Sequence, residues 1–225
     1  DILLPYTNRS CENLVAEGIP RNKIFISGNP IFEVIKKNIK NINKSNILKN
    51  LNIDKNKYFL LTIHRQENVD DIVRLKFIVR TLKKIYSKHK KPIIWPIHPR
   101  TFKNLKKFKI KLGSYIKILK PVDFFKFIKL EINSFCVLTD SGTVQEECSI
   151  FKIPNIILRE KTERPETVEA GSSIVSINST NEILNAINFS IKSSFLSNDI
   201  DAYKDLNVSN KILNIILSNY EFDKN

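Results

Sequence analysis

The chain has 225 residues, of which 42% are hydrophobic and 27% are charged, and it carries a formal net charge of +14. This length and apolar content suffice for one complete domain and part of a second. No run approaches the roughly 18 consecutive apolar residues of a membrane span, and no signal peptide is recognisable, so the sequence excludes a membrane protein and predicts a soluble, cytoplasmic one.

Residues 1–45 are predicted to be the end of an incomplete N-terminal Rossmann-like domain followed by a linker. The expected elements are a strand over Ile2–Pro5, a helix over Asn8–Glu17, a strand over Lys23–Ser27 and a helix from Ile31. The stretch Asn38–Asn50 is rich in Lys, Asn and Ile and has little periodicity, which is typical of a joint between domains. Because the sequence lacks methionine and opens on a strand-like run, we expect a piece of a longer protein.

Residues 46–225 are predicted to form a complete second Rossmann-like domain. Its strands are continuous apolar runs, which suit a buried parallel sheet: Tyr58–Ile63, Pro92–Ile97, Ile116–Leu119, Phe135–Thr139, Asn155–Leu158 and Ser173–Ile177. The expected helices are Asp71–Ser87, Asp123–Glu131, Val144–Phe151, Asn181–Ile191 and Asn210–Ser218. The βαβα order predicts the α/β class with a doubly wound parallel sheet.

Polar residues follow four of these strands, at the point where each strand ends. They are His64–Asn68, His98–Arg100, Pro121–Asp123 and Asp140–Gly142. In open α/β sheets, ligands bind at the carboxyl ends of the strands, so these segments are expected to converge on one crevice.

The turn Asp140–Thr143 precedes a helix start, where unpaired backbone N–H groups and the helix dipole attract anions. A phosphate is therefore the expected guest. Glu146 and Glu147 supply carboxylates for sugar hydroxyls, and Arg164 supplies a fork for phosphate. Together these residues predict a nucleotide-sugar pocket.

Simpler readings of the same residues stay open. Asp140 or Ser141 could serve merely as the cap of the helix that follows them. Glu67 and Asn68 could likewise serve only as caps of the helix that follows them. His64 could be a buried, satisfied histidine, and Phe127 could belong to the core. The segment His98–Arg100 could be a turn, and Arg65 and Arg100 could be solvated.

Lysines are spread over the whole chain without a nucleic-acid-binding signature, which favours a solvated surface; a basic nucleic-acid-binding module is the non-enzymatic alternative. Cys11, Cys136 and Cys148 form no CxxC motif and are expected to be reduced thiols in a cytoplasm. The three histidines lie far apart, so we expect no metal.

Three segments resemble the motifs of non-hydrolysing UDP-N-acetylglucosamine 2-epimerases in order and spacing. They are Thr62–Asp70 (TIHRQENVD), Thr139–Glu147 (TDSGTVQEE) and Thr162–Gly171 (TERPETVEAG). The segments Gly18-Ile19 and Ser27–Pro30 are similar to the stretch that leads out of that family's first domain. The likeness therefore covers nearly the whole chain.

The resemblance implies a two-domain, glycosyltransferase-B-like fold in which residues 46–225 are the UDP-binding domain. It implies that Ser141, Gly142 and Thr143 bind the diphosphate and that Glu147 binds the ribose hydroxyls. Val122 and Phe127 would lie near the uracil. His64, the candidate catalytic residue, would face the diphosphate and sugar with Arg65 and Arg164. UDP is part of the substrate, so no cofactor is expected, and the family implies a homodimer.

In such enzymes a base removes the C2 proton, UDP leaves by elimination to give a 2-acetamidoglycal, and UDP adds back after protonation on the opposite face. The family's acid/base carboxylates belong to first-domain segments that precede Asp1. We therefore expect this piece to bind UDP weakly and not to epimerise its sugar.

The sequence departs from the family pattern at two places, one in the diphosphate-binding turn and one near the C-terminus. Thr143 stands where many members have a second glycine, and Tyr203–Leu206 replaces a glycine-containing turn. The Ser-Gly-Thr variant is closer to members that make UDP-N-acetyl-L-fucosamine from a 6-deoxy sugar, which is one alternative. A UDP-sugar glycosyltransferase of the same fold is another.

Overall fold

The computed structural model describes residues 1–219, apart from the side chain at position 195, and divides into two compact units. Residues 40–198 form the larger unit, and residues 1–39 group with residues 199–219 in the smaller one. The sequence had placed residues after 199 with the second domain, whereas the structure packs them against the N-terminal stretch. Which domain of a longer protein each unit represents stays a prediction.

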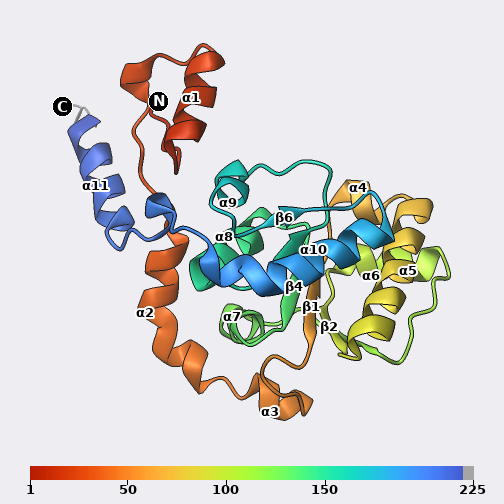
Figure 1. Cartoon of the computed structure of the whole chain (residues 1–225). Coiled ribbons are helices and arrows are strands. Elements are labelled where there is room, and N and C mark those ends of the chain that lie inside the picture. Colours follow the sequence, from red (N-terminus) through yellow and green to blue (C-terminus); the bar gives the residue numbers. More distant parts are fainter. Residues whose placement is uncertain (220–225) are drawn as a thin grey trace. The chain divides into compact units, whose positions relative to one another are not determined.

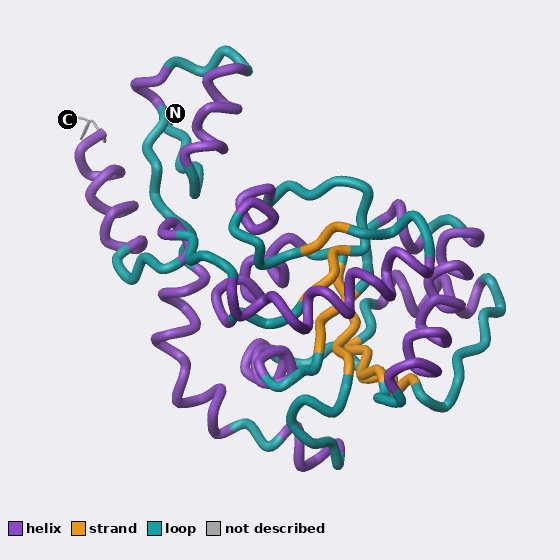
Figure 2. The backbone as a smooth tube through the Cα atoms, in the orientation of Figure 1, coloured by secondary structure: helices purple, strands orange, loops and turns teal. Residues whose placement is uncertain are grey.

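The larger unit contains a sheet, drawn in orange in Figure 2. It has six strands in the order β3-β2-β1-β4-β5-β6, and every neighbouring pair is parallel. The strands are β1 (Phe59–Thr62), β2 (Ile93–Pro96), β3 (Ile116–Leu119), β4 (Cys136–Thr139), β5 (Asn155–Ile157) and β6 (Ile174–Val175). Each lies inside one of the predicted apolar runs. The expected α/β class with a doubly wound parallel sheet is confirmed.

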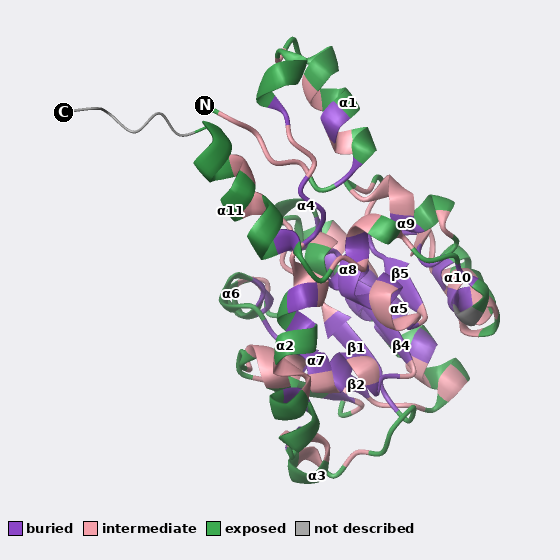
Figure 3. Cartoon of the chain, turned by 90° about the vertical axis from the view of Figure 1, so that its left-hand side faces the viewer, coloured by how far each residue is buried: buried purple, intermediate pink, exposed green. Residues whose placement is uncertain are grey.

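Helices cover both faces of this sheet (Figure 1). One face packs against α5 (Ile72–His89), α6 (Pro99–Lys107) and α10 (Thr180–Ser193), and the other against α3 (Ile47–Leu51), α7 (Phe124–Ile132) and α8 (Gly142–Phe151). Successive strand residues point to opposite faces, so Leu61 joins the first core and Leu60 the second. Both side chains are fully buried, which explains why the strands read as continuous apolar runs (Figure 3).

Three shorter helices complete the larger unit. They are α4 (Gln66–Val69), α9 (Pro165–Glu169) and the 3-10 turn η2 (Ser194–Leu196). The joint expected over Asn38–Asn50 is helical, because α2 continues to Lys44 and α3 follows after two residues. Helix α6 was missed by the sequence reading: Pro99 occupies its first turn and His98 caps it through Nδ1, which accepts the N–H of Arg100 at 3.2 Å. The segment is a helix start as well as a turn.

The smaller unit contains α1 (Asn8–Ala16), the first part of α2 (Ile31–Lys44), α11 (Val208–Asn219) and the 3-10 turns η1 (Arg21–Lys23) and η3 (Asp201–Tyr203). The strands predicted over Ile2–Pro5 and Lys23–Ser27 are reduced to one parallel bridge between Leu3 and Ile24. Two short strands alone do not form a stable sheet and need further strands or a packed helix beside them.

The three cysteines are free and buried, as expected for reduced core thiols. Over residues 1–219, none of the helices combines the length and the apolar composition that crossing a bilayer requires.

Glu33 links two helices of the smaller unit and generates a pH-dependent prediction. Its carboxylate pairs with Lys37 and accepts the N–H of Ser209, in the first turn of α11, at 2.9 Å. The Lys37 hydrogen bond and then the Ser209 N–H lower the pKa of Glu33 to about 2. Because the folded pKa lies below the unfolded one, this contribution to stability is complete above about pH 4.5 and is lost as the pH falls towards about 2.

We therefore expect Glu33→Gln to lower the Tm at pH 7, with a deficit that shrinks as the pH falls below about 4. Thermal unfolding followed by circular dichroism between about pH 3 and pH 7 measures this. The exposed Glu12→Gln on α1 is the control and should leave the Tm unchanged at every pH. A Glu33→Gln deficit that stays constant with pH would contradict the carboxylate's role.

Candidate functional site

A pocket opens beyond the carboxyl ends of four adjacent strands, β3, β2, β1 and β4, and has a volume of about 210 Å³. It is lined by Thr62, Ile63, His64, Pro96, Ile97, His98, Pro121, Val122, Phe127, Ser141 and Val144. Each of the four polar segments singled out in the sequence contributes to this lining. The winding of the sheet reverses between β1 and β4, and ligands of open α/β sheets bind at such a point.

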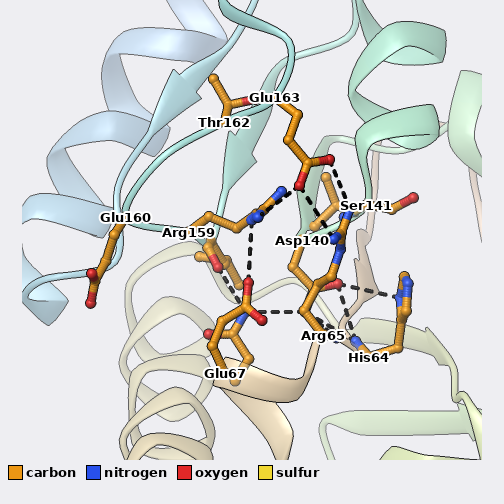
Figure 4. Close-up of polar contacts among 12 residues, drawn as sticks. His64, Arg65, Glu67, Asp140, Ser141, Arg159, Glu160, Thr162 and Glu163 are labelled. Carbon is orange, nitrogen blue, oxygen red and sulfur yellow. Dashed lines mark hydrogen bonds and ion pairs between the residues drawn. The ribbon is translucent and has the colours of Figure 1, made fainter. Parts of the chain in front are cut away.

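Asp140 ties the turn after β1 to the turn after β4 (Figure 4). It is fully buried, and its Oδ1 and Oδ2 accept the backbone N–H of His64 at 3.1 and 3.0 Å. Its Oδ2 also accepts the N–H of Arg65 at 3.0 Å. Arg65 is the N-cap of α4 and has no side-chain cap bond of its own, so the carboxylate from another strand organises this helix start.

The same carboxylate orients His64. Its Oδ1 lies 3.3 Å from His64 Nδ1, while the imidazole is about two-fifths exposed and lines the pocket. A carboxylate at Nδ1 fixes the orientation of the ring. His64 is therefore neither fully buried nor satisfied by a carbonyl, which was the simpler expectation.

Asn68 extends this network to a third strand. Its side chain is fully buried, and Nδ2 donates to Asp140 Oδ2 at 3.0 Å and to the carbonyl oxygen of Leu158 at 2.8 Å. Asn68 thus bridges strand ends, whereas α5 is capped by Asp71. The hydroxyls of Thr62 and Thr139 lie 2.6 Å apart on neighbouring strands, so β1 and β4 end level with each other.

Helix α8 begins at the rim of the pocket with free donors. The N–H of Gln145 is the first to bond back, to the carbonyl of Ser141, so those of Gly142, Thr143 and Val144 have no acceptor within the helix. The N-cap Ser141 makes no side-chain cap bond, and its hydroxyl is available to a ligand. The alternative in which the Ser141 side chain only caps the helix is therefore not supported. This end of α8 offers N–H donors, a hydroxyl and a positive dipole to an anion.

Arg164 is held beside that helix start. Its guanidinium pairs with buried Glu146. The guanidinium also lies close to Gly142, because a Cβ atom built on that glycine would be 3.8 Å from it. Gln145 fixes the loop that carries Arg164, because its side chain bonds Thr167, the carbonyl of Arg164 and the hydroxyl of Thr162. Sequence reasoning did not assign Gln145 a role. Glu146 binds Arg164 in the structure, whereas the sequence had offered it to sugar hydroxyls.

Glu147 lies one turn further along α8 and is almost completely buried. Burial raises its pKa, and nearby Glu146 raises it further, while a hydrogen bond with Glu131 acts in the opposite direction. Glu131, on α7, is fully buried, and burial together with Glu147 raises its pKa well above the usual range of a carboxyl.

The other predicted residues lie around the pocket. Val122 and Phe127 line it, and Phe127 also packs against the core between α7, α8 and the sheet, so it is at once a core residue and a pocket-lining residue. Arg65 pairs with Glu163 at 3.2 Å on the outer side, where Figure 4 shows it in a network with Arg159 and Glu67. The roles predicted for the individual residues stay predictions.

His98 is a pocket residue that the set of site candidates lacked. Its ring centroid lies 5.4 Å from that of His64, and it lines the pocket while capping α6. Its position after the second strand was the available signal. Within residues 1–219, no group of three or more His, Cys, Asp or Glu side chains is arranged to hold a metal ion.

Comparison with known proteins shows the family to which the chain belongs. The family model described as UDP-N-acetylglucosamine 2-epimerase matches residues 1–217. The UDP-N-acetylglucosamine 2-epimerase of Methanocaldococcus jannaschii is 45% identical over 182 residues, which is 78% of this chain and 50% of that protein. The Methanococcus maripaludis enzyme of the same name is 39% identical over 223 residues, 96% of this chain and 60% of that protein.

A solved structure agrees. The Methanocaldococcus jannaschii UDP-GlcNAc 2-epimerase in complex with UDP-GlcNAc and UDP superposes with a TM-score of 0.88 at 40% identity. The match covers 96% of this chain and 61% of that one. The chain thus spans between half and about three-fifths of the length of these relatives.

The Asp140 network generates a stability prediction. Asp140→Asn replaces one acceptor oxygen by an NH2 group that faces the N–H donors of His64 and Arg65, so buried donors lose their partner. We expect the free energy of unfolding to fall by about 2–4 kcal/mol. Urea unfolding measures this through the fluorescence of Trp95, the single and fully buried tryptophan.

The matched control is Asp71→Asn. Asp71 also accepts two backbone N–H bonds, but at an exposed N-cap where asparagine serves as well as aspartate, so the expected change is under about 0.5 kcal/mol. Equal losses in the two variants would show that Asp140 is only a helix cap.

Proposed function

Because the chain belongs to the UDP-N-acetylglucosamine 2-epimerase family, we propose that its larger unit binds the UDP moiety of a UDP-N-acetylhexosamine in the pocket beyond β1 and β4. The whole protein would interconvert UDP-N-acetylglucosamine and UDP-N-acetylmannosamine. The observation that carries this proposal is the free start of α8, with the Ser141 hydroxyl in the pocket wall and the Arg164 guanidinium beside Gly142.

The proposed nucleotide position follows the order of these groups. The diphosphate lies at the N–H groups of Gly142 and Thr143, with Ser141 and Arg164 on either side, because donors and positive charge gather there. The uracil lies towards Val122 and Phe127, which supply apolar and aromatic surface. The ribose lies between them, above Glu147.

The proposed reaction needs a stabilised leaving group. Removal of the C2 proton and cleavage of the C1–O bond give a 2-acetamidoglycal and UDP, and the reverse steps with protonation on the opposite face give the epimer. Charge develops on the departing diphosphate, so the α8 start and Arg164 lower the barrier where that charge appears. His64 takes the catalytic role: Asp140 holds its ring in the pocket wall, from where it can donate a hydrogen bond to the leaving diphosphate.

Acid/base groups for both faces of C2 are also required. Among the described residues that line the pocket, none is a carboxylate. Since the chain spans only half to three-fifths of its relatives' length, we propose that the remaining part of the whole protein supplies these carboxylates. The family likeness also supports a homodimer for the whole protein. A 6-deoxy UDP-sugar remains the alternative substrate on the basis of the Ser141-Gly142-Thr143 variant.

The Ser141 hydroxyl offers a test that separates binding from folding. Ser141→Ala removes no cap bond, so we expect stability to change by less than about 0.5 kcal/mol while UDP affinity falls about five- to ten-fold. Titration of the isotope-labelled chain with UDP, followed by NMR chemical shifts, measures the affinity.

The matched control is Ser179→Ala at the N-cap of α10. Ser179 accepts the N–H of Glu182 at 3.2 Å, so this variant should lose about 1 kcal/mol of stability and keep its UDP affinity. Unchanged affinity in Ser141→Ala, or equal affinity losses in both variants, would contradict the proposed diphosphate position.

Turnover gives a second test. We expect the 225-residue chain to produce no UDP-N-acetylmannosamine from UDP-N-acetylglucosamine, because its pocket lacks the C2 carboxylates. Proton NMR of the sugar anomeric signals over hours follows the conversion, with a full-length relative as the positive control. Conversion by this chain alone would place the acid/base groups among its own residues.

A further inference from the structure

Two buried carboxyl groups face each other behind the pocket, one on each of the neighbouring helices α7 and α8. On α7, Phe127 lines the pocket and Glu131 follows four residues later on the same face. On α8, Val144 lines the pocket and Glu147 follows three residues later. The pair Glu131–Glu147 therefore lies one helical turn behind the wall on which a nucleotide would rest.

The surroundings of Glu131 are unusual for a carboxylate. The side chain is fully buried beside the apolar cluster that contains Leu130, Val144 and Cys148. Its Oε1 accepts one weak hydrogen bond from the Cys148 thiol at 3.2 Å. Its Oε2 is buried and receives no hydrogen bond from any described donor. An ionised carboxylate with one oxygen unpaired in such a site is strongly destabilised.

A proton on Oε2 resolves this. A neutral carboxylic acid has a donor, and the group that faces Glu131 is the carboxyl of Glu147, which is an acceptor when ionised. Two ionised carboxylates side by side in a buried site repel each other and have no water to solvate them. One proton shared by the pair is therefore the expected state. Burial raises the pKa of both carboxyl groups, and the proton is assigned to Glu131 because its Oε2 is the buried oxygen that lacks a hydrogen-bond partner among the described residues.

Resting on the proposed function, we propose that Glu131 is a positioning residue: as a neutral acid it donates a hydrogen bond to Glu147 and holds that carboxylate towards the ribose hydroxyls of the bound nucleotide. Glu131 itself touches no ligand. The ribose hydroxyls donate to the remaining lone pairs of Glu147, so the affinity for the ribose depends on a side chain one helix away.

The test compares UDP with 2′,3′-dideoxyuridine 5′-diphosphate, which lacks both ribose hydroxyls, on the 225-residue chain. Wild type should bind UDP about ten-fold more tightly than the analogue. Glu131→Met fills similar volume without a donor and should bind UDP about ten-fold more weakly, with unchanged affinity for the analogue. Glu131→Gln retains an N–H donor and should restore UDP affinity to within about three-fold.

Cys148→Ala is the matched control. It removes the other hydrogen bond to Glu131 and perturbs the same core, but leaves the contact between the two carboxyl groups intact. Its preference for UDP over the analogue should equal that of wild type. If Glu131→Met weakens both ligands equally, or weakens neither, the proposed positioning role is wrong.

A spectroscopic measurement does not depend on the folding of Glu131→Met. Wild type at neutral pH should show the infrared C=O band of a buried carboxylic acid, and this band should be absent from Glu131→Gln. Identical spectra in this region would overturn the inference. Failure of wild type to bind UDP at all would instead overturn the proposed function, whereas UDP binding without preference over the analogue would remove only the role given to Glu131 and Glu147.

Discussion

The site depends on one buried carboxylate. Asp140 lies at the end of β4 and gathers the backbone N–H groups of His64 and Arg65 and the amide of Asn68, all of which follow β1. A buried carboxylate surrounded by donors is stable only while those donors stay in place, so the turn after β1 cannot move independently of β4. The same contact holds the His64 ring at the pocket. The packing of the two turns and the position of the candidate catalytic His64 therefore both depend on Asp140.

Around Asp140, helix α8 divides its residues between two tasks. Its first residues leave N–H groups and a hydroxyl open to the pocket, while Gln145, Glu146 and Glu147 turn inward. Gln145 holds the Arg164 loop, Glu146 holds the guanidinium, and Glu147 meets Glu131 behind the wall. Three consecutive buried polar residues are unusual in a helix. Here each has a partner that fixes one wall of the site.

The larger unit was predictable from sequence because its strands are buried on both faces. Continuous apolar runs such as Cys136–Thr139 and Ile93–Pro96 leave few alternatives to a parallel sheet, and the polar residues after them mark its carboxyl edge. The strand expected over Lys23–Ser27 failed because local propensity cannot supply the neighbours that a sheet requires. Helix α6 was missed because a proline after His98 signals a turn and a helix start alike.

Side-chain partners were less predictable than elements. Nothing in the spacing of Glu146 and Arg164 shows that they pair, since 18 residues separate them, or that Asn68 reaches Leu158 across 90 residues. Such contacts depend on how the sheet is wound, and sequence patterns encode that winding only indirectly. The carboxyl pair behind the pocket is the extreme case, because a glutamate at position 131 reads simply as the polar face of a helix.

The ion pair between Arg164 and Glu146 has a consequence for how this position tolerates change. Glu146 is only 3% exposed, so it needs its counter-ion whether or not any nucleotide is present. Loss of the arginine would leave the buried Glu146 carboxylate without a counter-ion. A substitution of Arg164 that abolishes activity would therefore be explained by misfolding as readily as by lost ligand binding. For the same reason, a homologue that no longer acts on a sugar would still need an arginine at this position to keep its fold.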